Sequence, residues 1–317
     1  MGELIKPKNF ALIGAAGYIA PRHMRAIKET GNVLVAALDP FDSVGIIDSF
    51  FPNADFFIEP ERFDRHLDKL RRSGNGKVDF VSICSPNYLH DAHIRLALRN
   101  DTHAICEKPL LLNPWNLKGL EEIEKDTGKK IYNVLQLRHH PSIIALKEKF
   151  DAMPDDKIHD IELSYITSRG KWYFYSWKGD IKKSGGVVTN IGIHFFDMLS
   201  WIFGKVQNST VHISQENKAA GLLQLEKANI KWFLSLDSND LPDKIKKKNQ
   251  PTYRSIKIDN EEIEFSGGFT DLHTISYTEI LDGKGYGIKD AGNSIEIAHM
   301  IRNQQPIGKR GDYHPLL

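Results

Sequence analysis

Two basic side chains in this sequence stand in settings suited to proton transfer. Lys108 lies in Cys106-Glu107-Lys108-Pro109, directly after an apolar stretch that predicts a buried strand. His194 lies four residues after Asn190 in a stretch that predicts a helix. A histidine has an ordinary pKa near neutral pH, and a lysine can hold a developing alkoxide by a charge-assisted hydrogen bond. The pair predicts removal of a hydroxyl proton, with His194 favoured as the base, Lys108 as the group that positions the oxygen, and Lys108 as the alternative base.

The helix expected around His194 has a polar and an apolar face. With α-helical spacing from near Asn190, the polar face carries Asn190, His194, Asp197 and Trp201, and the buried face carries Ile191, Phe195, Leu199 and Ile202. An isolated histidine on a helix is usually structural. Here it lies among polar residues, shortly after a Gly185-Gly186 pair that would let a ligand come close. This setting favours a functional His194 and a substrate-facing Asn190.

The elements that must position Lys108 begin with a βαβ unit that contains a turn of small residues. A predicted strand ends at Ile13, a helix follows the turn Gly14–Ala20, and a second predicted strand ends at Asp39. The turn matches a dinucleotide-binding pattern in which alanine replaces the first and third glycines. Small residues let a pyrophosphate approach the N–H groups of a helix N-terminus. We therefore expect pyrophosphate contacts from the backbone of Gly17, Tyr18 and Ile19.

Asp39 indicates which dinucleotide is bound. An acidic residue about twenty positions after such a turn accepts the ribose hydroxyls of the adenosine. No arginine or lysine adjoins Asp39-Pro40, and the carboxylate would repel the extra phosphate of NADP. The expected cofactor is therefore NAD.

Strands and helices continue to alternate to about residue 136. Further strands are expected at 78–84, 103–106 and 130–135, with helices at 60–72, 90–100 and 113–127. This alternation is typical of a doubly wound parallel sheet, which binds ligands outside the carboxyl ends of its strands. The residues expected at those ends are Gly17, Asp39, Ser85, Asn87, Lys108 and Gln136. Residues 1–136 are thus expected to form an NAD-binding Rossmann domain.

Beyond Leu137 the pattern changes to strands with few crossover helices. A helix is expected at 140–150, and strands at 160–167, 210–214, 221–225, 229–236, 255–258 and 262–265. Strands without crossover helices pair mostly antiparallel. Residues 137–317 are therefore expected to form an α/β domain on a large open sheet, which binds substrate and mediates oligomerisation. The basic run 244–248 is expected to be a solvated loop.

The segment 168–180 follows neither strand nor helix periodicity. It combines aromatic rings with cations, which continue at Lys182 and Lys183. Two interpretations are open: an irregular subunit interface, or a pocket in which rings stack on flat groups and cations hold anions. The residues expected to line such a pocket are Tyr165, Arg169, Trp172, Tyr173 and Lys178. His273 is explained equally well as a pocket residue or as a core histidine.

The bulk composition excludes some classes of function. A net charge of +1 argues against nucleic-acid binding driven by bulk electrostatics, and no apolar run reaches the length of a membrane span. Cys84 and Cys106 lie in apolar strand-like contexts and are expected to be buried reduced thiols, with no disulfide and no metal site. A cytoplasmic protein is expected.

Four motifs, present in order, resemble the Gfo/Idh/MocA family of sugar oxidoreductases. They are the small-residue turn with a downstream His23, Ser85-Pro86-Asn87-x-x-His90, Glu107-Lys108-Pro109 and Gly192-x-His194-x-x-Asp197. The resemblance covers essentially the whole chain and implies a Rossmann domain followed by a C-terminal α/β domain. It also implies that His90 and Glu107 belong to the cofactor-binding set. Many members carry aspartate at the position of Asn190, so this chain lacks the acid that would orient or charge His194.

Longer stretches are similar to family members that oxidise C3 of UDP-N-acetyl-D-glucosaminuronic acid in bacterial O-antigen synthesis. These stretches are Phe10–His23, Tyr132–His140, Tyr165–Asp180 and Phe269–Tyr277. The similarity implies NAD as acceptor, a 3-keto product for an aminotransferase, and a homotetramer. Two other functions remain open. An NAD-dependent dehydrogenase of another sugar or cyclitol would need fewer cations, and the presence of both Lys108 and His194 argues against a non-catalytic NAD-responsive regulator.

Overall fold

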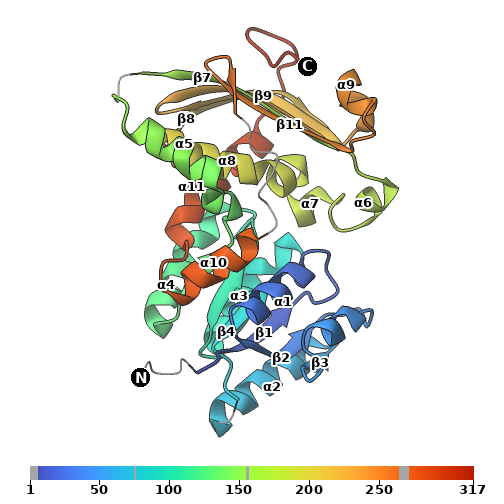
Figure 1. Ribbon diagram of the computed structural model, residues 1–317, viewed down its shortest axis with the longest axis vertical. Helices are drawn as coiled ribbons and strands as arrows, with labels where there is room; N and C mark the ends of the chain where they lie inside the picture. Colours follow the sequence, from blue (N-terminus) through green and yellow to red (C-terminus); the bar gives the residue numbers. More distant parts are fainter. Residues whose placement is uncertain (1–5, 75, 155–156, 264–270) are drawn as a thin grey trace. The chain divides into compact units, whose positions relative to one another are not determined.

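The computed structural model describes residues 6–74, 76–154, 157–263 and 271–317, and their contacts define two compact units. Unit 1 comprises Met1–Leu111, Trp115–Gln136 and Thr270–Ala291, and unit 2 comprises Leu112–Pro114, Leu137–Phe269 and Gly292–Leu317. Unit 1 therefore includes a segment from the second half of the chain, Thr270–Ala291, and unit 2 includes a short segment from the first half, Leu112–Pro114. Each unit contains one six-stranded sheet (Figure 1).

The sheet of unit 1 is parallel throughout and has the strand order β3-β2-β1-β4-β5-β6. Its strands are β1 (Asn9–Ile13), β2 (Val33–Leu38), β3 (Asp55–Phe57), β4 (Phe80–Ile83), β5 (His103–Cys106) and β6 (Ile131–Asn133). The order reverses between β1 and β4, and doubly wound sheets bind ligands at such a switch point. The Rossmann fold expected from the sequence is confirmed.

Helices α1 and α10 lie side by side in unit 1, although more than 240 residues separate them in the chain. The α-helices of this unit are α1 (Ala20–Glu29), α2 (Pro60–Ser73), α3 (His90–Arg99), α4 (Leu117–Thr127) and α10 (Leu272–Leu281). One buried cluster joins Met24 of α1 and Tyr277 of α10 to Phe10 and Phe80 of the sheet. Phe10 stacks on both Phe80 and Tyr277, with ring centroids 5.1 and 5.8 Å apart. Apolar burial therefore fixes α10 on the Rossmann sheet.

The sheet of unit 2 has the order β12-β11-β7-β10-β9-β8. Its strands are β7 (His159–Thr167), β8 (Val206–Ser214), β9 (Lys218–Leu225), β10 (Ala228–Ser235), β11 (Thr252–Ile258) and β12 (Glu261–Glu262). Within the described ranges β7 and β10 pair parallel and the other neighbours pair antiparallel. The mostly antiparallel sheet expected from the sequence is confirmed.

Helix α8 packs its apolar side chains on one face of this second sheet. Phe196 of α8 meets Trp232 of β10 edge to face at 5.6 Å, and Phe203 of α8 packs on Phe150 of α5. The remaining helical elements are α5 (Pro141–Asp151), α6 (Lys171–Tyr175), α7 (Ile181–Ser184), a π-helical turn (Val188–Gly192), α8 (Ile193–Phe203), α9 (Asp243–Lys246) and α11 (Ile288–Asn303). Short 3₁₀ turns lie at Gly45–Ser49, Asn87–Leu89, Pro114–Asn116, Gln136–His139 and Ser238–Asp240.

Several expectations need correction. By length and composition, the helical stretch Ile181–Phe203 could span a membrane, contrary to the expectation from the sequence. In the structure 78% of its most apolar 18-residue segment is buried, as is common for a core helix. The basic run 244–248 is not simply a loop, because α9 takes up part of it. Helices α10 and α11 were not expected. The end of the strand expected at 262–265 lies outside the described residues.

Candidate functional site

The turn after β1 requires glycine at its first position. Gly14 has φ +89°, and a Cβ there would lie 2.6 Å from the carbonyl carbon of Cys84 and 2.7 Å from the backbone nitrogen of Ser85. A side chain is therefore excluded both by the backbone conformation and by the end of β4. Ala15 and Ala20 replace the first and third glycines of the dinucleotide-binding pattern, and this replacement does not change the requirement for glycine at position 14. The expectation from the sequence centred on Gly17 and did not include the role of Gly14.

Asp39 links the end of β2 to the same turn. Its Oδ2 accepts a hydrogen bond from the Ala16 N–H and its Oδ1 accepts one from the Phe41 N–H, both at 2.9 Å. The Gly17 N–H donates to the Gly14 carbonyl at 3.0 Å, so it serves the turn itself. Tyr18 is exposed in the turn before α1. This arrangement holds Asp39 beside the turn, where a dinucleotide fold meets the adenosine ribose.

His90 connects the loops that follow β4 and β5. Its Nδ1 lies 2.6 Å from the Pro109 carbonyl oxygen and its Nε2 lies 2.9 Å from the Ser85 carbonyl oxygen. The ring is 0% exposed, so it supports these loops from inside. The Ser85 hydroxyl lies 2.8 Å from Nδ1 of His93, whose pKa burial and the neighbouring His90 lower to about 4. Asn87 is buried in the short turn before α3.

The Lys108 turn is held by its preceding residue. The Glu107 N–H donates to the Ile83 carbonyl at 3.0 Å, and the Lys108–Pro109 peptide bond is cis. The Glu107 carboxylate faces the interior of unit 1, where its Oε1 lies 2.9 Å from Nε2 of both His23 and His273. Lys108 is half-buried directly after β5. Glu107 thus supports the turn from within.

The electrostatic surroundings of Glu107 favour its ionised form. Burial would raise the pKa of this carboxyl group, but the hydrogen bonds and charges of His23 and His273 outweigh it and hold the pKa well below its usual range. Burial is also the main cause that lowers the pKa of His23. Burial raises the pKa of both Cys84 and Cys106 well above the usual range, and both are free buried thiols as expected.

In unit 2 the structure brings Asn190 and Tyr173 together. The Asn190 Nδ2 donates to the Tyr173 hydroxyl at 2.7 Å, and both residues are buried. Burial raises the pKa of Tyr173. Asn190 lies within the π-helical turn, and such turns occur frequently at functional sites.

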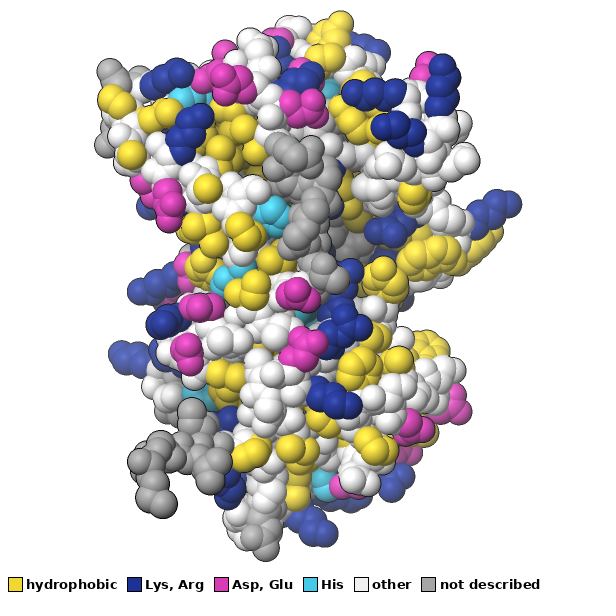
Figure 2. All heavy atoms as spheres, in the orientation of Figure 1, with side chains coloured by type: hydrophobic (Ala, Val, Ile, Leu, Met, Phe, Trp, Pro, Cys, Tyr) yellow, Lys and Arg dark blue, Asp and Glu magenta, His cyan; other side chains and the backbone are white. Residues whose placement is uncertain are grey.

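Lys178 lies against two tryptophans. Its Nζ is 5.1 Å from the Trp172 ring centroid and 5.5 Å from that of Trp177, within the range of cation–π contacts. Burial, with the nearby Arg169 charge, lowers the pKa of Lys178. Trp172 remains 53% exposed, and Figure 2 shows hydrophobic and basic side chains together on the surface over α6. Tyr165 instead packs on Phe195, with ring centroids 4.8 Å apart.

Asp197 lies one helical turn after His194 in α8, and its partner comes from a different element. Asp197 is buried in a two-point ion pair, accepting from Arg138 Nη2 at 2.7 Å and Nε at 3.0 Å. His194 is half-buried in the first turn of α8. The expected face assumed α-helical spacing from Asn190, and the π-helical turn at 188–192 breaks that spacing. The predicted buried face of α8 is confirmed, since Phe195, Leu199 and Ile202 are all buried.

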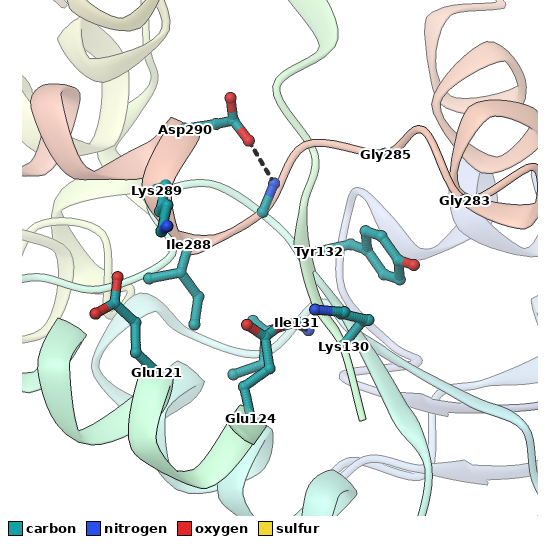
Figure 3. A pocket seen from close by; sticks show the side chains of 11 residues that line it. Glu121, Glu124, Lys130, Ile131, Tyr132, Gly283, Gly285, Ile288, Lys289 and Asp290 are labelled. Atoms are coloured by element: carbon teal, nitrogen blue, oxygen red, sulfur yellow. Dashed lines mark hydrogen bonds between the residues drawn. The ribbon is translucent and has the colours of Figure 1, made fainter. Parts of the chain in front are cut away.

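A pocket of about 520 Å³ lies elsewhere in unit 1, beside the start of β6. Glu121 and Glu124 project toward it from α4, and Lys289 and Asp290 come from the start of α11 (Figure 3). Asp290 accepts the Gly287 N–H at 2.8 Å and so stabilises the backbone before α11. Rossmann sheets bind ligands at the opposite, carboxyl ends of their strands. We therefore place the candidate site at the strand ends and not in this pocket.

Three residues beside the candidate site were not recognised as such from the sequence: Gly14, His93 and Tyr277. The sequence left His273 open as a pocket residue or a core histidine, and the structure buries it against Glu107. Gly14 carried a local signal, since it directly follows a predicted strand. His93 stands three residues after His90 and therefore on a neighbouring part of the same helix face. Tyr277 carried no local signal, because it reaches the Rossmann sheet only through the packing of α10.

Comparison with known proteins identifies both halves of the chain. Residues 8–135 match the model of the Gfo/Idh/MocA oxidoreductase family, NAD-binding Rossmann fold, and residues 156–241 match that family's C-terminal α/β domain. Crystal structures of the WlbA (WbpB) dehydrogenase from Thermus thermophilus are 50% identical in sequence and cover 98% of this chain and 100% of their own. The complex with NAD and alpha-ketoglutarate has a TM-score of 0.95, and the complex with NAD and UDP-GlcNAcA one of 0.94.

Curated relatives are more distant. The inositol 2-dehydrogenase of Rhizobium meliloti is 27% identical over 62% of this chain, and the glucose-6-phosphate 3-dehydrogenase of Bacillus subtilis is 26% identical over 62%. The chain spans about half the length of these relatives, 55% and 54%.

Proposed function

Because this chain belongs to the Gfo/Idh/MocA family of oxidoreductases, we propose that it oxidises the C3 hydroxyl of UDP-N-acetyl-D-glucosaminuronic acid to a ketone, with NAD as the acceptor. The half-identical Thermus thermophilus enzyme, crystallised with NAD and UDP-GlcNAcA, supports this substrate. The reaction belongs to nucleotide-sugar synthesis for bacterial O-antigen lipopolysaccharide. We further propose a cytoplasmic homotetramer whose 3-keto product passes to an aminotransferase.

The residues of unit 1 fit NAD. The Gly14 turn leaves no room for a Cβ against β4, and the N–H groups of Tyr18 and Ile19 begin the helix that would receive the pyrophosphate. Asp39 stands at the ribose position, and no adjacent cation would balance a 2′-phosphate. Ser85, Asn87, Lys108 and Gln136 complete the proposed NAD-binding set, with His90 and Glu107 acting behind it.

The proposed chemistry needs one acceptor and one base. Bound NAD supplies the hydride acceptor for the C3 hydrogen of the sugar. His194 takes the C3 hydroxyl proton, and the Lys108 ammonium donates a hydrogen bond to the same oxygen as negative charge develops on it. The two electrons of the C3–H bond leave as hydride, the O–H electron pair becomes the second C–O bond, and the proton stays on the enzyme. Asn190, fixed by Tyr173, orients the sugar beside His194.

The observation that carries the substrate assignment is the cationic and aromatic surface of α6 and its flanks. A nucleotide uronate has a pyrophosphate and a carboxylate, and both need positive charge. Lys178 sits against the rings of Trp172 and Trp177, with Arg169 close enough to affect its charge. A neutral monosaccharide would make no use of this arrangement.

A substrate comparison tests this proposal. NADH formation is followed by absorbance with UDP-N-acetylglucosaminuronic acid, UDP-N-acetylglucosamine, myo-inositol and glucose, and the product is identified by mass spectrometry. We expect kcat/KM for the uronate to exceed the others by at least about 10³-fold. Preference for a free sugar or cyclitol would replace the proposed substrate, and NADH binding without turnover of any of them would favour a regulator.

Neutralising Arg169 and Lys178, the cations on either side of α6, should weaken substrate binding with little effect on the chemical step. We expect Arg169→Gln and Lys178→Gln each to raise KM for the nucleotide uronate about 10-fold to 100-fold while kcat stays within about threefold, since a charge-assisted hydrogen bond contributes about 1.5–3 kcal/mol. Lys182→Gln, an exposed cation in the same stretch, is the matched control and should behave as wild type. Steady-state kinetics measure all three, and an unchanged KM in both variants would remove these residues from the site.

A further inference from the structure

A chain of hydrogen bonds runs through the core of unit 1 and ends behind Lys108. The Ser82 hydroxyl lies 2.6 Å from the Tyr277 hydroxyl, which lies 2.7 Å from Nδ1 of His23. Nε2 of His23 lies 2.9 Å from Oε1 of Glu107, and Nε2 of His273 lies 2.9 Å from the same oxygen. All five side chains are buried. They come from α1, α10 and the ends of β4 and β5.

The positions of the protons follow from the partners. An ionised carboxylate only accepts, so both histidines donate to Glu107 through Nε2. With its proton on Nε2, a neutral His23 accepts the Tyr277 hydroxyl hydrogen at Nδ1, and Tyr277 then accepts from Ser82. This assignment needs only a proton on Nε2 of each ring and an ionised carboxylate. The 2.9 Å separations are hydrogen-bond distances.

We propose that His273, together with His23, is a positioning residue for Lys108: the two rings keep Glu107 ionised and fix its side chain, and Glu107 in turn holds the Lys108 backbone. This inference rests on the proposed role of Lys108 in oxidation. None of the histidines that contact Glu107 touches the substrate in this proposal.

The geometry of the turn supports this role. Oε2 of Glu107 accepts the Lys108 N–H at 3.2 Å, while Oε1 is held by both histidines. The Glu107 N–H is bonded to β4, and the carbonyl of Pro109 is bonded to His90. The residues before, at and after Lys108 are therefore anchored on three sides. Of these three anchors, only the one made by the Glu107 side chain depends on the protonation state of a carboxyl group.

The charge state of Glu107 depends on those two donors. Burial alone raises its pKa, and the histidine hydrogen bonds reverse the direction. The other ionisable groups around it are the thiols of Cys84 and Cys106, the Tyr277 phenol, His90, and Lys108 itself. The first three have pKa values raised by burial and stay neutral, and burial lowers the pKa of His90. If one donor is lost, burial should therefore raise the pKa of Glu107 and let it take up a proton as the pH falls.

Removing the His273 donor should create a new pH dependence. Relative to the wild type at the same pH, we expect the kcat of His273→Leu to fall a further ~10-fold as the pH drops from about 8 to about 6, in addition to the loss that protonation of His194 causes in both proteins. His273→Gln, whose amide can donate in place of Nε2, should restore the wild-type profile. Glu107→Gln/His273→Leu carries no titrating carboxyl at position 107, so its kcat should be low and its ratio to the wild-type kcat should not change with pH. A loss of packing alone would lower kcat equally at every pH in both His273 variants.

An infrared difference spectrum gives a readout without turnover. Spectra of His273→Leu at about pH 6 minus about pH 8 should show the carbonyl band of a protonated buried carboxyl group that is absent in wild type and in the double variant. The absence of that band overturns the inference, whether or not the enzyme turns over the nucleotide uronate. Stoichiometric metal in the wild type, measured by elemental analysis, would also overturn it, because the histidine nitrogens would then not be donors. If the band appears but no substrate is oxidised, the proposed function fails and the proton assignment stands.

Discussion

Replacing Lys108 by methionine should lower kcat about 10³-fold while the affinity for NADH changes by less than about threefold. Methionine keeps the length and apolar stem of lysine but cannot donate a hydrogen bond to the developing alkoxide. His194→Asn should cause a loss of about 10²-fold to 10⁴-fold, because general-base catalysis contributes on this scale. Stopped-flow measurement of NADH formation gives kcat, and NADH fluorescence gives binding. Lys125→Met, an exposed lysine of α4, is the matched control.

The pH profile of the two variants identifies the base. If His194 takes the proton, kcat/KM in the wild type falls as the pH drops below the ordinary histidine value of about 6.5, and His194→Asn removes that limb. If Lys108 takes it, the limb persists in His194→Asn and disappears in Lys108→Met. The double variant should lose little more than the worse single variant, since residues that act as a unit are not additive. Near-normal turnover in both single variants would refute the mechanism.

Replacing Gly14 by alanine should destabilise unit 1 and weaken NADH binding together. The new Cβ would meet backbone atoms of Cys84 and Ser85 at 2.6–2.7 Å, in a backbone conformation with φ +89°. Backbone cannot move aside as a flexible side chain can, so we expect a loss of more than about 3 kcal/mol in unfolding free energy and at least about a 10-fold loss of NADH affinity. Urea unfolding followed by fluorescence, with NADH titration, measures both.

Gly31→Ala provides the control for this effect. Gly31 also has a positive φ of +75°, but a Cβ added there would have no atom within 4 Å. Only the conformational penalty of about 1 kcal/mol should appear, without a change in NADH affinity. Equal losses in the two variants would show that the close approach to β4 is unimportant.

Local sequence signals were sufficient to predict the fold of the first half of the protein. The βαβ unit was predicted from a strand followed by a small-residue turn and an acidic residue at a set spacing, and these features interact over few residues. The strand ends then placed Asp39, Ser85 and Lys108 at one edge of the sheet, because every strand of a parallel sheet ends there. The dominant antiparallel pairing of the second sheet likewise followed from the lack of crossover helices.

Two features of unit 2 could not be predicted in this way. The π-helical turn at 188–192 shifts the spacing between Asn190 and His194, and a fixed period of 3.6 residues cannot represent it. The ion-pair partner of Asp197 is Arg138, which lies 59 residues earlier and carried no local signal. A buried carboxylate takes the best available cation, and its identity depends on packing.

The sequence by itself determined the family, the parallel sheet and the strand ends that carry the nucleotide-binding residues, because each is encoded in short-range patterns. Only the tertiary structure decided what lies behind Lys108. His273 reaches Glu107 across 166 residues, and Gly14 is required by a strand that ends 69 residues later. Both contacts arise because apolar burial brings distant elements together, and only then do polar partners meet.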